Sequence, residues 1–479
     1  MEPTRRTPLR FVMTLAVCPA VALAGCVRPL RGGPRELPAA ATPAGDPDAS
    51  GPAGLVPFPA ATVPPPAAPT PGNAAGPGFG RELRPDAVVA QVLARNPTVA
   101  QMAAAVRMAN ARYPQVTALD DPALASWLAP ASLGSDKVND SARFEVSQKF
   151  PFPGKRALRG EAAQAEASAA GYDLEDTKLD LIEGAKAAYA DYYLAVRALE
   201  VNADGQRLLG EFKRNAEARY ETGQTPQQDI LQAEVELGRQ SEQRLALERA
   251  RAVAVARLNT LMNLPPESPL PPPAKIARPP AALPAVRELR ELALSRRPDL
   301  HALAARVAAD AAALGLAERE YYPDIEAMAA YDSFWQSADD QERLRPQVGI
   351  RVNLPLRLDR RRGAVAEASA RLAERRATLA RQQNQVAFDV QQAYAEVRES
   401  EQAAALYARR ILPAARENVK SAQSGYMTGN IPFLALIEAQ RSLVELRDRS
   451  YLAIADSERR RATLERVVGG PLPNASAGR

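Results

Sequence analysis

Two segments of this chain carry the same pattern of residues: YETGQTPQQDILQA at positions 220–233 and YMTGNIPFLALIEA at positions 426–439. Both keep Tyr, Gly and Pro at the same spacing, and both continue into a stretch with helical periodicity. The copies lie about 206 positions apart, which is a domain length rather than the length of a solenoid unit. The pattern predicts that the chain is a tandem duplication.

Other landmarks recur in the same order. They are Asn96-Pro97 with Arg297-Pro298, Phe144 to Pro151 with Val348 to Pro355, and Ala188-Tyr189-Ala190 with Ala393-Tyr394-Ala395. Their offsets run only from about 201 to about 206, so the two halves differ by small changes in loop length. We expect a first structural repeat at 83–275, a second at 276–468 and a C-terminal tail at 469–479.

Each repeat contains one exceptionally long helical segment. From Lys155 to Tyr220 there is no proline, and about 65 residues at 1.5 Å each make a rod of about 100 Å. Apolar residues follow the alternating 3-4 spacing of a coiled coil, at Ile182, Ala185, Tyr189, Tyr192, Val196, Leu199 and Ala203. The second repeat carries the same pattern from Val386 to Ile411, with Ser400 as an exception and a kink expected at Pro413.

The Tyr-x-x-Gly-x-x-Pro pattern predicts that each rod reverses direction. Gly223 and Gly429 suit a helix C-cap with positive φ, and Pro226 and Pro432 suit the first turn of the next helix. Returning helices are expected at about 226–263 and 432–468. Each repeat therefore ends in a long antiparallel helical hairpin.

Before each rod the periodicity changes to two, which is typical of strands with one apolar and one charged face. Such strands are expected near 143–150 and 348–354, each preceded by another at 123–129 and 324–335. Trp127 and Trp335 fall in the leading strands, where interfacial aromatic residues of a membrane barrel are expected, unless they belong to a soluble core. Four strands cannot close a barrel, so three copies with twelve strands are expected to complete the wall.

The N-terminus predicts export and a lipid anchor. Residues 1–25 combine Arg residues with a short apolar run, too short to span a bilayer, and lead to Leu23-Ala24-Gly25-Cys26. That ending resembles a lipoprotein signal with Cys26 as the lipidated residue; an ordinary signal peptide remains the alternative. Residues 26–82, rich in Pro and Ala, are expected to form an extended tether.

Composition argues against several other classes. Without residues 1–25 the formal charge falls from +5 to about +3, which gives no reason to expect nucleic-acid binding. The single histidine, His301, has no partners for a metal or catalytic site, and no nucleotide-binding motif is present. No enzyme activity, cofactor or metal is expected.

Taken together, residues 84–468 resemble the outer-membrane efflux protein family of TolC-like channels. The most specific signatures are the two Tyr-x-x-Gly reversals and the Phe150-Pro151-Phe152-Pro153-Gly154-Lys155-Arg156 turn. The resemblance implies a mainly α protein that forms a homotrimer, with a twelve-stranded barrel in outer-membrane lipid and an α-helical tunnel extending through the periplasm. It further implies a periplasmic adaptor and an inner-membrane pump as partners, in an RND or type I secretion system.

The resemblance also assigns roles to single residues. It places adaptor contacts at the helical tips, which here are Tyr220, Gly223, Gln224, Thr225, Pro226, Tyr426, Gly429, Asn430, Ile431 and Pro432. It places an acidic constriction nearby, which falls on Asp229 and Glu438, while Ala435 takes one acidic position of the family. We therefore expect a mixed ring of three Asp229 and three Glu438.

Two other classes and the cargo stay open. A periplasmic coiled-coil lipoprotein acting as an adaptor or scaffold should carry a β domain between its helices, and a lipoprotein enzyme or polysaccharide-binding protein should carry clustered acids, histidines or aromatics. The Pro-Gly-Lys-Arg turn at 153–156 weakly resembles the cation-efflux branch. Drugs, solvents, cations and secreted proteins all fit a wide polar tunnel.

Overall fold

The computed structural model describes residues 79–130, 142–276, 283–333 and 345–473, so the signal segment, Cys26 and Trp335 lie outside the described residues. The helices are α1 (Pro85–Arg95), α2 (Pro97–Thr117), α3 (Lys155–Glu221), α4 (Gln227–Leu261), α5 (Val286–Arg296), α6 (Pro298–Arg319), α7 (Leu358–Leu406), the π-helical turn η3 (Tyr407–Ile411), α8 (Leu412–Met427) and α9 (Phe433–Val468). The strands are β1 (Ala123–Leu128), β2 (Ala142–Phe150), β3 (Ile325–Ser333) and β4 (Arg345–Val352). The second half repeats the element order of the first.

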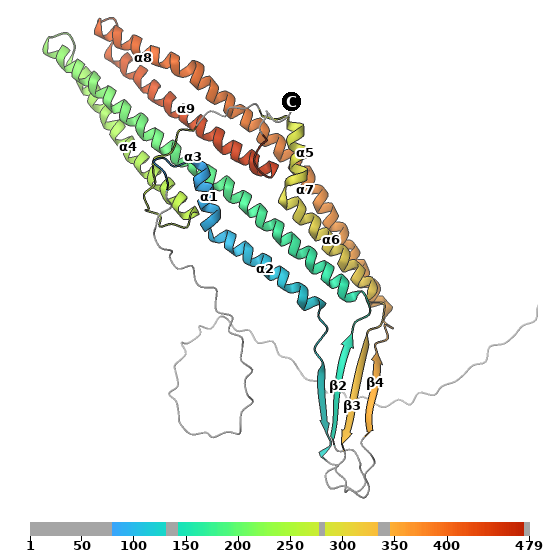
Figure 1. The fold of residues 1–479 in the computed structure, drawn as a ribbon. Helices are drawn as coiled ribbons and strands as arrows, with labels where there is room; N and C mark the ends of the chain where they lie inside the picture. The colour runs from blue at the N-terminus through green and yellow to red at the C-terminus, as the bar shows by residue number, and fades with distance from the viewer. Residues whose placement is uncertain (1–78, 131–141, 277–282, 334–344, 474–479) are drawn as a thin grey trace, which may run out of the picture. The chain divides into compact units, whose positions relative to one another are not determined.

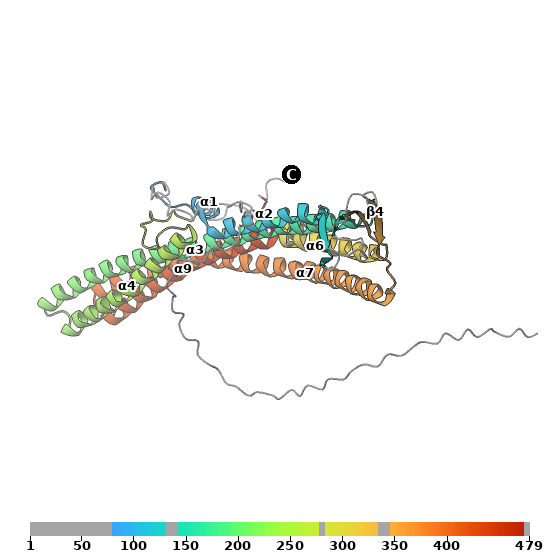
Figure 2. The same cartoon turned by 90° about the horizontal axis from the view of Figure 1, so that it is seen from below.

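The long helix α3 is the centre of the helical part. It packs against α2 and α6 toward the sheet, and against α4 and α9 toward the opposite end (Figure 1). The rod of the second half consists of α7, η3 and α8, and α9 returns along it. Figure 2 shows α3, α4, α7 and α9 side by side from below. The two helical hairpins expected from the sequence are thus present, with both tips at the end away from the sheet (Figure 1).

The four strands form one antiparallel sheet in the order β1-β2-β3-β4. Directly paired residues lie on the same face of the sheet. The pairs Val146–Ala329 and Ala329–Val348 therefore show which residues of β2, β3 and β4 share a face. One face is apolar, with Leu124, Phe144, Val146, Phe150, Ile325, Tyr331, Val348, Ile350 and Val352, all of them exposed in the single chain. The other face carries Arg143, Glu145, Lys149, Glu326, Asp332 and Arg351. The mainly helical fold with a four-stranded barrel contribution is confirmed.

Trp127 lies on the charged face of this sheet. It pairs directly with Arg143, and the Arg143 guanidinium carbon lies 6.0 Å from the centre of the Trp127 ring. A residue of an interfacial girdle would lie on the apolar face instead. The lipid-facing role expected for Trp127 is therefore not supported, because the β1–β2 register turns its side chain toward the polar residues.

The buried face of α3 changes partner along its length. Tyr189 and Tyr192 pack in a cluster with α1 and α4, whereas Phe212 and Ala216 pack in a second cluster with α8 and α9. The predicted coiled-coil seam holds at Ala185, Tyr189 and Tyr192 but is wrong at Ala203, which is exposed. A single straight seam could not serve both sets of neighbours, because an α-helix drifts relative to a seven-residue repeat.

The rod of the second half is interrupted where the sequence predicts a kink. The π-helical turn η3 ends at Ile411, and Pro413 stands in the first turn of α8. Proline has no N–H and its ring displaces the carbonyl four residues earlier, so a wider turn before it relieves the clash. The corresponding part of α3 has no proline and continues as α-helix.

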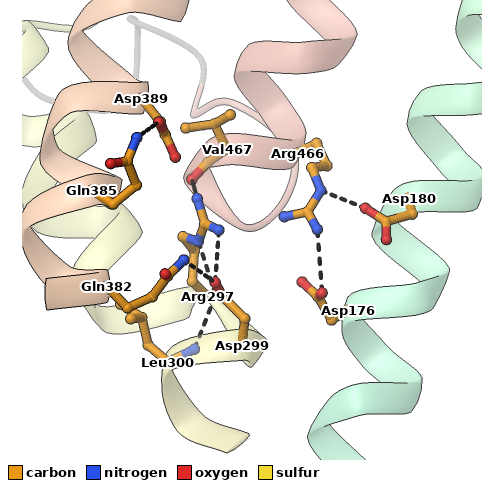
Figure 3. Close-up of polar contacts among 10 residues, drawn as sticks. All are labelled: Asp176, Asp180, Arg297, Asp299, Leu300, Gln382, Gln385, Asp389, Arg466 and Val467. Carbon is orange, nitrogen blue, oxygen red and sulfur yellow. Dashed lines mark hydrogen bonds and ion pairs between the residues drawn. The ribbon is translucent and has the colours of Figure 1, made fainter. Parts of the chain in front are cut away.

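In each half, a matching joint fixes the end of the returning helix to the short link between the first two helices of that half. The Asn96 amide donates to the Leu261 carbonyl at the end of α4 over 2.9 Å. In the second half, Arg297 donates to the Val467 carbonyl at the end of α9 over 3.3 Å and forms a two-bond pair with Asp299 (Figure 3). Asn96 before α2 and Arg297 before α6 therefore each bind a carbonyl that the end of a returning helix leaves unpaired.

A third joint links the sheet to the helices across the two halves. The Lys155 ammonium group is 1% exposed and lies 2.9 Å from Asp324 Oδ1, 3.0 Å from the Tyr322 carbonyl and 3.4 Å from Glu320 Oε2. The Phe152 N–H also donates to Asp324 Oδ1, and the Phe152 and Tyr322 rings stack with centres 4.6 Å apart. A buried ammonium requires this set of acceptors. The turn before α3 is thereby fixed to the segment between α6 and β3.

Candidate functional site

The two hairpin tips adopt the same turn. Gly223 has φ +70°, its N–H donates to the Tyr220 carbonyl over 2.9 Å, and the Gln224 N–H donates to the Arg219 carbonyl over 2.8 Å. Gly429 repeats this arrangement with φ +77°. A glycine in this left-handed conformation satisfies the carbonyls at the helix end. The helix C-caps expected from the sequence are therefore present at both tips.

The prolines at the tips stand one position earlier than expected. Pro226 and Pro432 are the N-cap residues of α4 and α9, with extended ψ of 154° and 155°, and the helices begin at the next residue. The side chains of Gln224 and Asn430 lie exposed at the apex of each tip. The tips therefore present short turns with exposed polar side chains.

Three residues join the two tips within the chain, and we call them the tip latch: Arg219, Tyr426 and Asp229. Arg219 Nη1 donates to the carbonyls of Tyr426 and Met427 over 2.7 and 2.8 Å, and its guanidinium lies over the Tyr426 ring at 5.0 Å. The Tyr426 hydroxyl donates to Asp229 Oδ2 over 3.1 Å. The latch thus connects the end of α3, the end of α8 and the start of α4.

The tip latch occurs once per chain, although the tips themselves are duplicated. By the offset of the repeat, Gly425 replaces Arg219 and Ala435 replaces Asp229, and Tyr220 is 46% exposed whereas Tyr426 is 4% exposed. Burial, followed by the neighbouring Asp229 carboxylate, raises the pKa of Tyr426 to about 12. The hydroxyl therefore stays protonated at physiological pH and remains the donor.

The two residues expected to form an acidic ring have different surroundings. Asp229 is half-buried and accepts the latch hydrogen bond, whereas Glu438 is exposed on α9. One turn further, Arg441 pairs with the buried Glu236 of α4 over 2.7 Å. This ion pair between the returning helices was not predictable from the sequence, because neither residue belongs to a recurring motif. A ring needs three copies and stays a prediction.

A groove of about 850 Å³ lies over α3 between α4 and α9. Its wall includes Asp448, whose Oδ1 atom is buried and has no hydrogen-bond partner among the described residues. Burial raises the pKa of Asp448 to about 6, and Arg447 only partly opposes that shift. Asp448 is thus a charged group that the fold disfavours at neutral pH.

Asp448→Asn is expected to stabilise the protein at pH 8 and to leave it unchanged at pH 4. Because the folded pKa lies above the unfolded value of 3.8, the wild type loses stability as pH rises from about 4 through about 6. After allowance for solvent screening, the gain at pH 8 is about 1 kcal/mol. Thermal unfolding in detergent at both pH values measures it. Glu445→Gln on the exposed side of α9 is the control, and an equal pH dependence in both variants would contradict the assignment.

The single histidine takes part in packing. His301 Nε2 lies 3.0 Å from the Ser295 carbonyl, and its ring stacks on Tyr172 with centres 5.2 Å apart. Within the described ranges, no group of three or more His, Cys, Asp or Glu residues is arranged to hold a metal ion. His301 therefore serves the contact between α6 and α3.

Comparison with known proteins places this geometry in a family. The family model described as outer membrane efflux protein matches residues 88–264 and 289–470. The outer-membrane channel OprN is similar in structure, with 21% identity and a TM-score of 0.68, over 81% of this chain and 90% of OprN. The outer membrane protein VceC of Vibrio cholerae is similar at 19% identity and a TM-score of 0.65, over 81% of this chain and 97% of VceC.

A third similar structure is the open state of the MtrE outer membrane channel of Neisseria gonorrhoeae, at 18% identity and a TM-score of 0.66, over 81% of this chain and 89% of MtrE. No curated protein matches the chain. At these identities the structural likeness concerns the fold. The family match covers both halves of the chain, including both hairpin tips and the four strands that the structure describes. The chain belongs to the outer membrane efflux protein family.

Proposed function

We propose that this protein is the outer-membrane channel of a tripartite exporter. In this role it conducts cargo passively from a periplasmic adaptor and an inner-membrane pump to the exterior. Membership of the family supports the proposal. The observation that carries it is the four-stranded sheet, in which an exposed apolar face is backed by a charged one.

The sheet calls for further copies of the chain. Among the described strands, β1 and β4 each pair on one side only, and in lipid every unpaired backbone group costs several kcal/mol. Four strands are too few for a closed barrel. Three copies in a ring supply twelve strands and leave no edge, with the apolar face toward lipid and Arg143, Glu145, Glu326 and Arg351 toward a water-filled interior.

The opposite end of the molecule supplies the entrance and its gate. The exposed turns around Gly223 and Gly429 contact the adaptor, and the tip latch holds the two hairpins of each chain together. Release of the hydrogen bond between Tyr426 and Asp229 lets the tips separate. Asp229 and Glu438 then line the entrance and favour cations.

The N-terminal sequence supports a location at the outer membrane. Cys26 is lipidated and becomes the N-terminal residue of the mature protein, and residues 26–82 tether the body to the periplasmic leaflet of the outer membrane. Selection of cargo belongs to the pump and the adaptor. A role as a periplasmic adaptor or scaffold has less support, because the sheet lies at one end of the helices instead of between them (Figure 1).

Crosslinked co-purification of the tagged protein from native membranes tests this function. We expect an inner-membrane pump and a periplasmic adaptor to be identified by mass spectrometry, and the class of pump to reveal the class of cargo. Recovery of the trimer without any adaptor would contradict the exporter role.

Gln224→Trp at the first tip is expected to abolish recovery of the adaptor while the trimer persists, since a bulky side chain at an exposed apex blocks docking without touching the core. The matched control is Gln101→Trp, the same change at an exposed position of α2 far from the tips. Equal recovery of the adaptor with both variants would contradict docking at the first tip.

A further inference from the structure

The repeat duplicates the two sides of the joint at Lys155, but the duplicated residues do not meet within a single chain. Arg156 donates to the Thr117 carbonyl at the end of α2 over 2.8 Å, and Arg361 donates to the Glu320 carbonyl just after α6 over 2.7 Å. These equivalent contacts align α3 with α7 at an offset of about 205 and α2 with α6 at an offset of about 203. On the same alignment, Arg360 is the counterpart of Lys155.

The acidic side of the joint is duplicated as well. The offset between α2 and α6 places Asp121 at the position of Asp324, in the segment that leads from the helix into the strand. Within the chain, Lys155 and Asp324 meet because β2 and β3 are neighbours in the sheet. Arg360 and Asp121 belong instead to the two edges of the sheet, where β4 and β1 have no neighbour on the outer side among the described strands (Figure 1).

Both charged groups are free for a partner in the described chain. Asp121 and Arg360 are exposed, and neither side chain has an ion pair or hydrogen bond among the described residues. In the equivalent joint within the chain, by contrast, the Lys155 side chain is buried to 1% exposure. The charges are of opposite sign, and each lies beside the sheet edge that a neighbouring copy would extend.

We propose that Arg360 of one copy pairs with Asp121 of the next, and that this pair joins the copies where the barrel meets the helices. The pair repeats between copies the contact that Lys155 and Asp324 make within one chain. The inference rests on the trimer of the proposed function, since the repeat places β4 of one copy beside β1 of the next. The partner of this contact is thus a second copy of this chain.

Chemical crosslinking tests the pair directly in the full-length protein. Because an Arg–Asp pair holds its backbones further apart than the Cα–Cα distance of about 4.4–6.8 Å in a disulfide, a bifunctional thiol reagent is used. Asp121→Cys combined with Arg360→Cys is expected to give a covalent trimer in native membranes. The control combines Arg360→Cys with Arg107→Cys, an exposed site further back on α2, and should give no covalent trimer.

Charge exchange provides a second measurement if the double cysteine variant does not fold. Arg360→Asp should lower the temperature at which the trimer dissociates on a native gel, and adding Asp121→Arg should restore most of the loss. Arg362→Asp is the control, because Arg362 already lies 3.5 Å from Asp359 of its own chain. A trimer without crosslinking or rescue would overturn this pair and leave the channel role standing. A monomer in native membranes would overturn both.

Discussion

Replacing Asp324 with alanine is expected to lower the free energy of unfolding by about 3 kcal/mol, because it leaves the Lys155 ammonium buried without its nearest carboxylate. The substitution also removes the acceptor of the Phe152 N–H. Glu320 offers only partial replacement, since it lies 3.4 Å from Lys155 and its side chain is 44% exposed. Thermal unfolding of the purified protein, followed by circular dichroism, measures the loss.

Two variants distinguish the buried pair from general damage at the joint. Glu320→Ala removes a carboxylate from the same ammonium but an exposed one, so a change of less than about 1 kcal/mol is expected. Lys155→Met combined with Asp324→Leu removes both charges and should cost less than Asp324→Ala alone. If Asp324→Ala lowered the free energy of unfolding no more than Glu320→Ala, the stabilising role assigned to the buried pair would be contradicted.

Tyr426→Phe is expected to open the entrance and raise the single-channel conductance several-fold. The change removes only the hydroxyl that binds Asp229, while the ring stays packed against Phe433 and under Arg219. A hydrogen bond to a charged group contributes about 1.5–3 kcal/mol, and a trimer loses three of them. A total near 5 kcal/mol suffices to turn a mostly closed population into a mostly open one. Planar-bilayer recording measures the change.

The same recording separates the tip latch from the acidic ring. Tyr426→Phe keeps both carboxylates and should therefore preserve block by divalent cations. Glu438→Ala should weaken that block without raising the resting conductance, since Glu438 takes no part in the latch. Unchanged conductance in Tyr426→Phe would rule out the latch as a gate. Unchanged conductance and cation block in Asp229→Ala combined with Glu438→Ala would rule out the ring.

Features that depend on local sequence were predictable. The turns at Gly223 and Gly429 follow from a glycine that tolerates positive φ, and the strands follow from a period of two. The duplication added weight, because each local signal occurs twice in the same order. The helices and strands accordingly begin and end within a few residues of their expected limits.

Features that join distant segments were not predictable. The tip latch brings Arg219 to a carbonyl 207 positions away, and its counterpart in the repeat is Gly425, so comparison of the two halves gives no signal. The burial of the Lys155 side chain likewise depends on the pairing of β2 with β3, which brings Asp324 next to it. Such contacts are set by topology, which periodicity alone does not specify.

The expectation that Trp127 faces lipid was wrong for a similar reason. Leu124, Trp127 and Leu128 do not alternate cleanly, so composition alone did not settle which face the tryptophan occupies. The pairing with Arg143 settles it, because directly opposed residues in antiparallel strands share a face. A sequence interpretation of β1 would have required the β1–β2 register.

Electron cryo-microscopy of the full-length protein in lipid nanodiscs tests the central claim most directly. We predict a particle with threefold symmetry in which three four-stranded sheets close one barrel within the lipid disc, with the helices extending from it on one side. Single chains with an open sheet, or a sheet lying outside the lipid, would contradict the assignment of this protein as a trimeric outer-membrane channel.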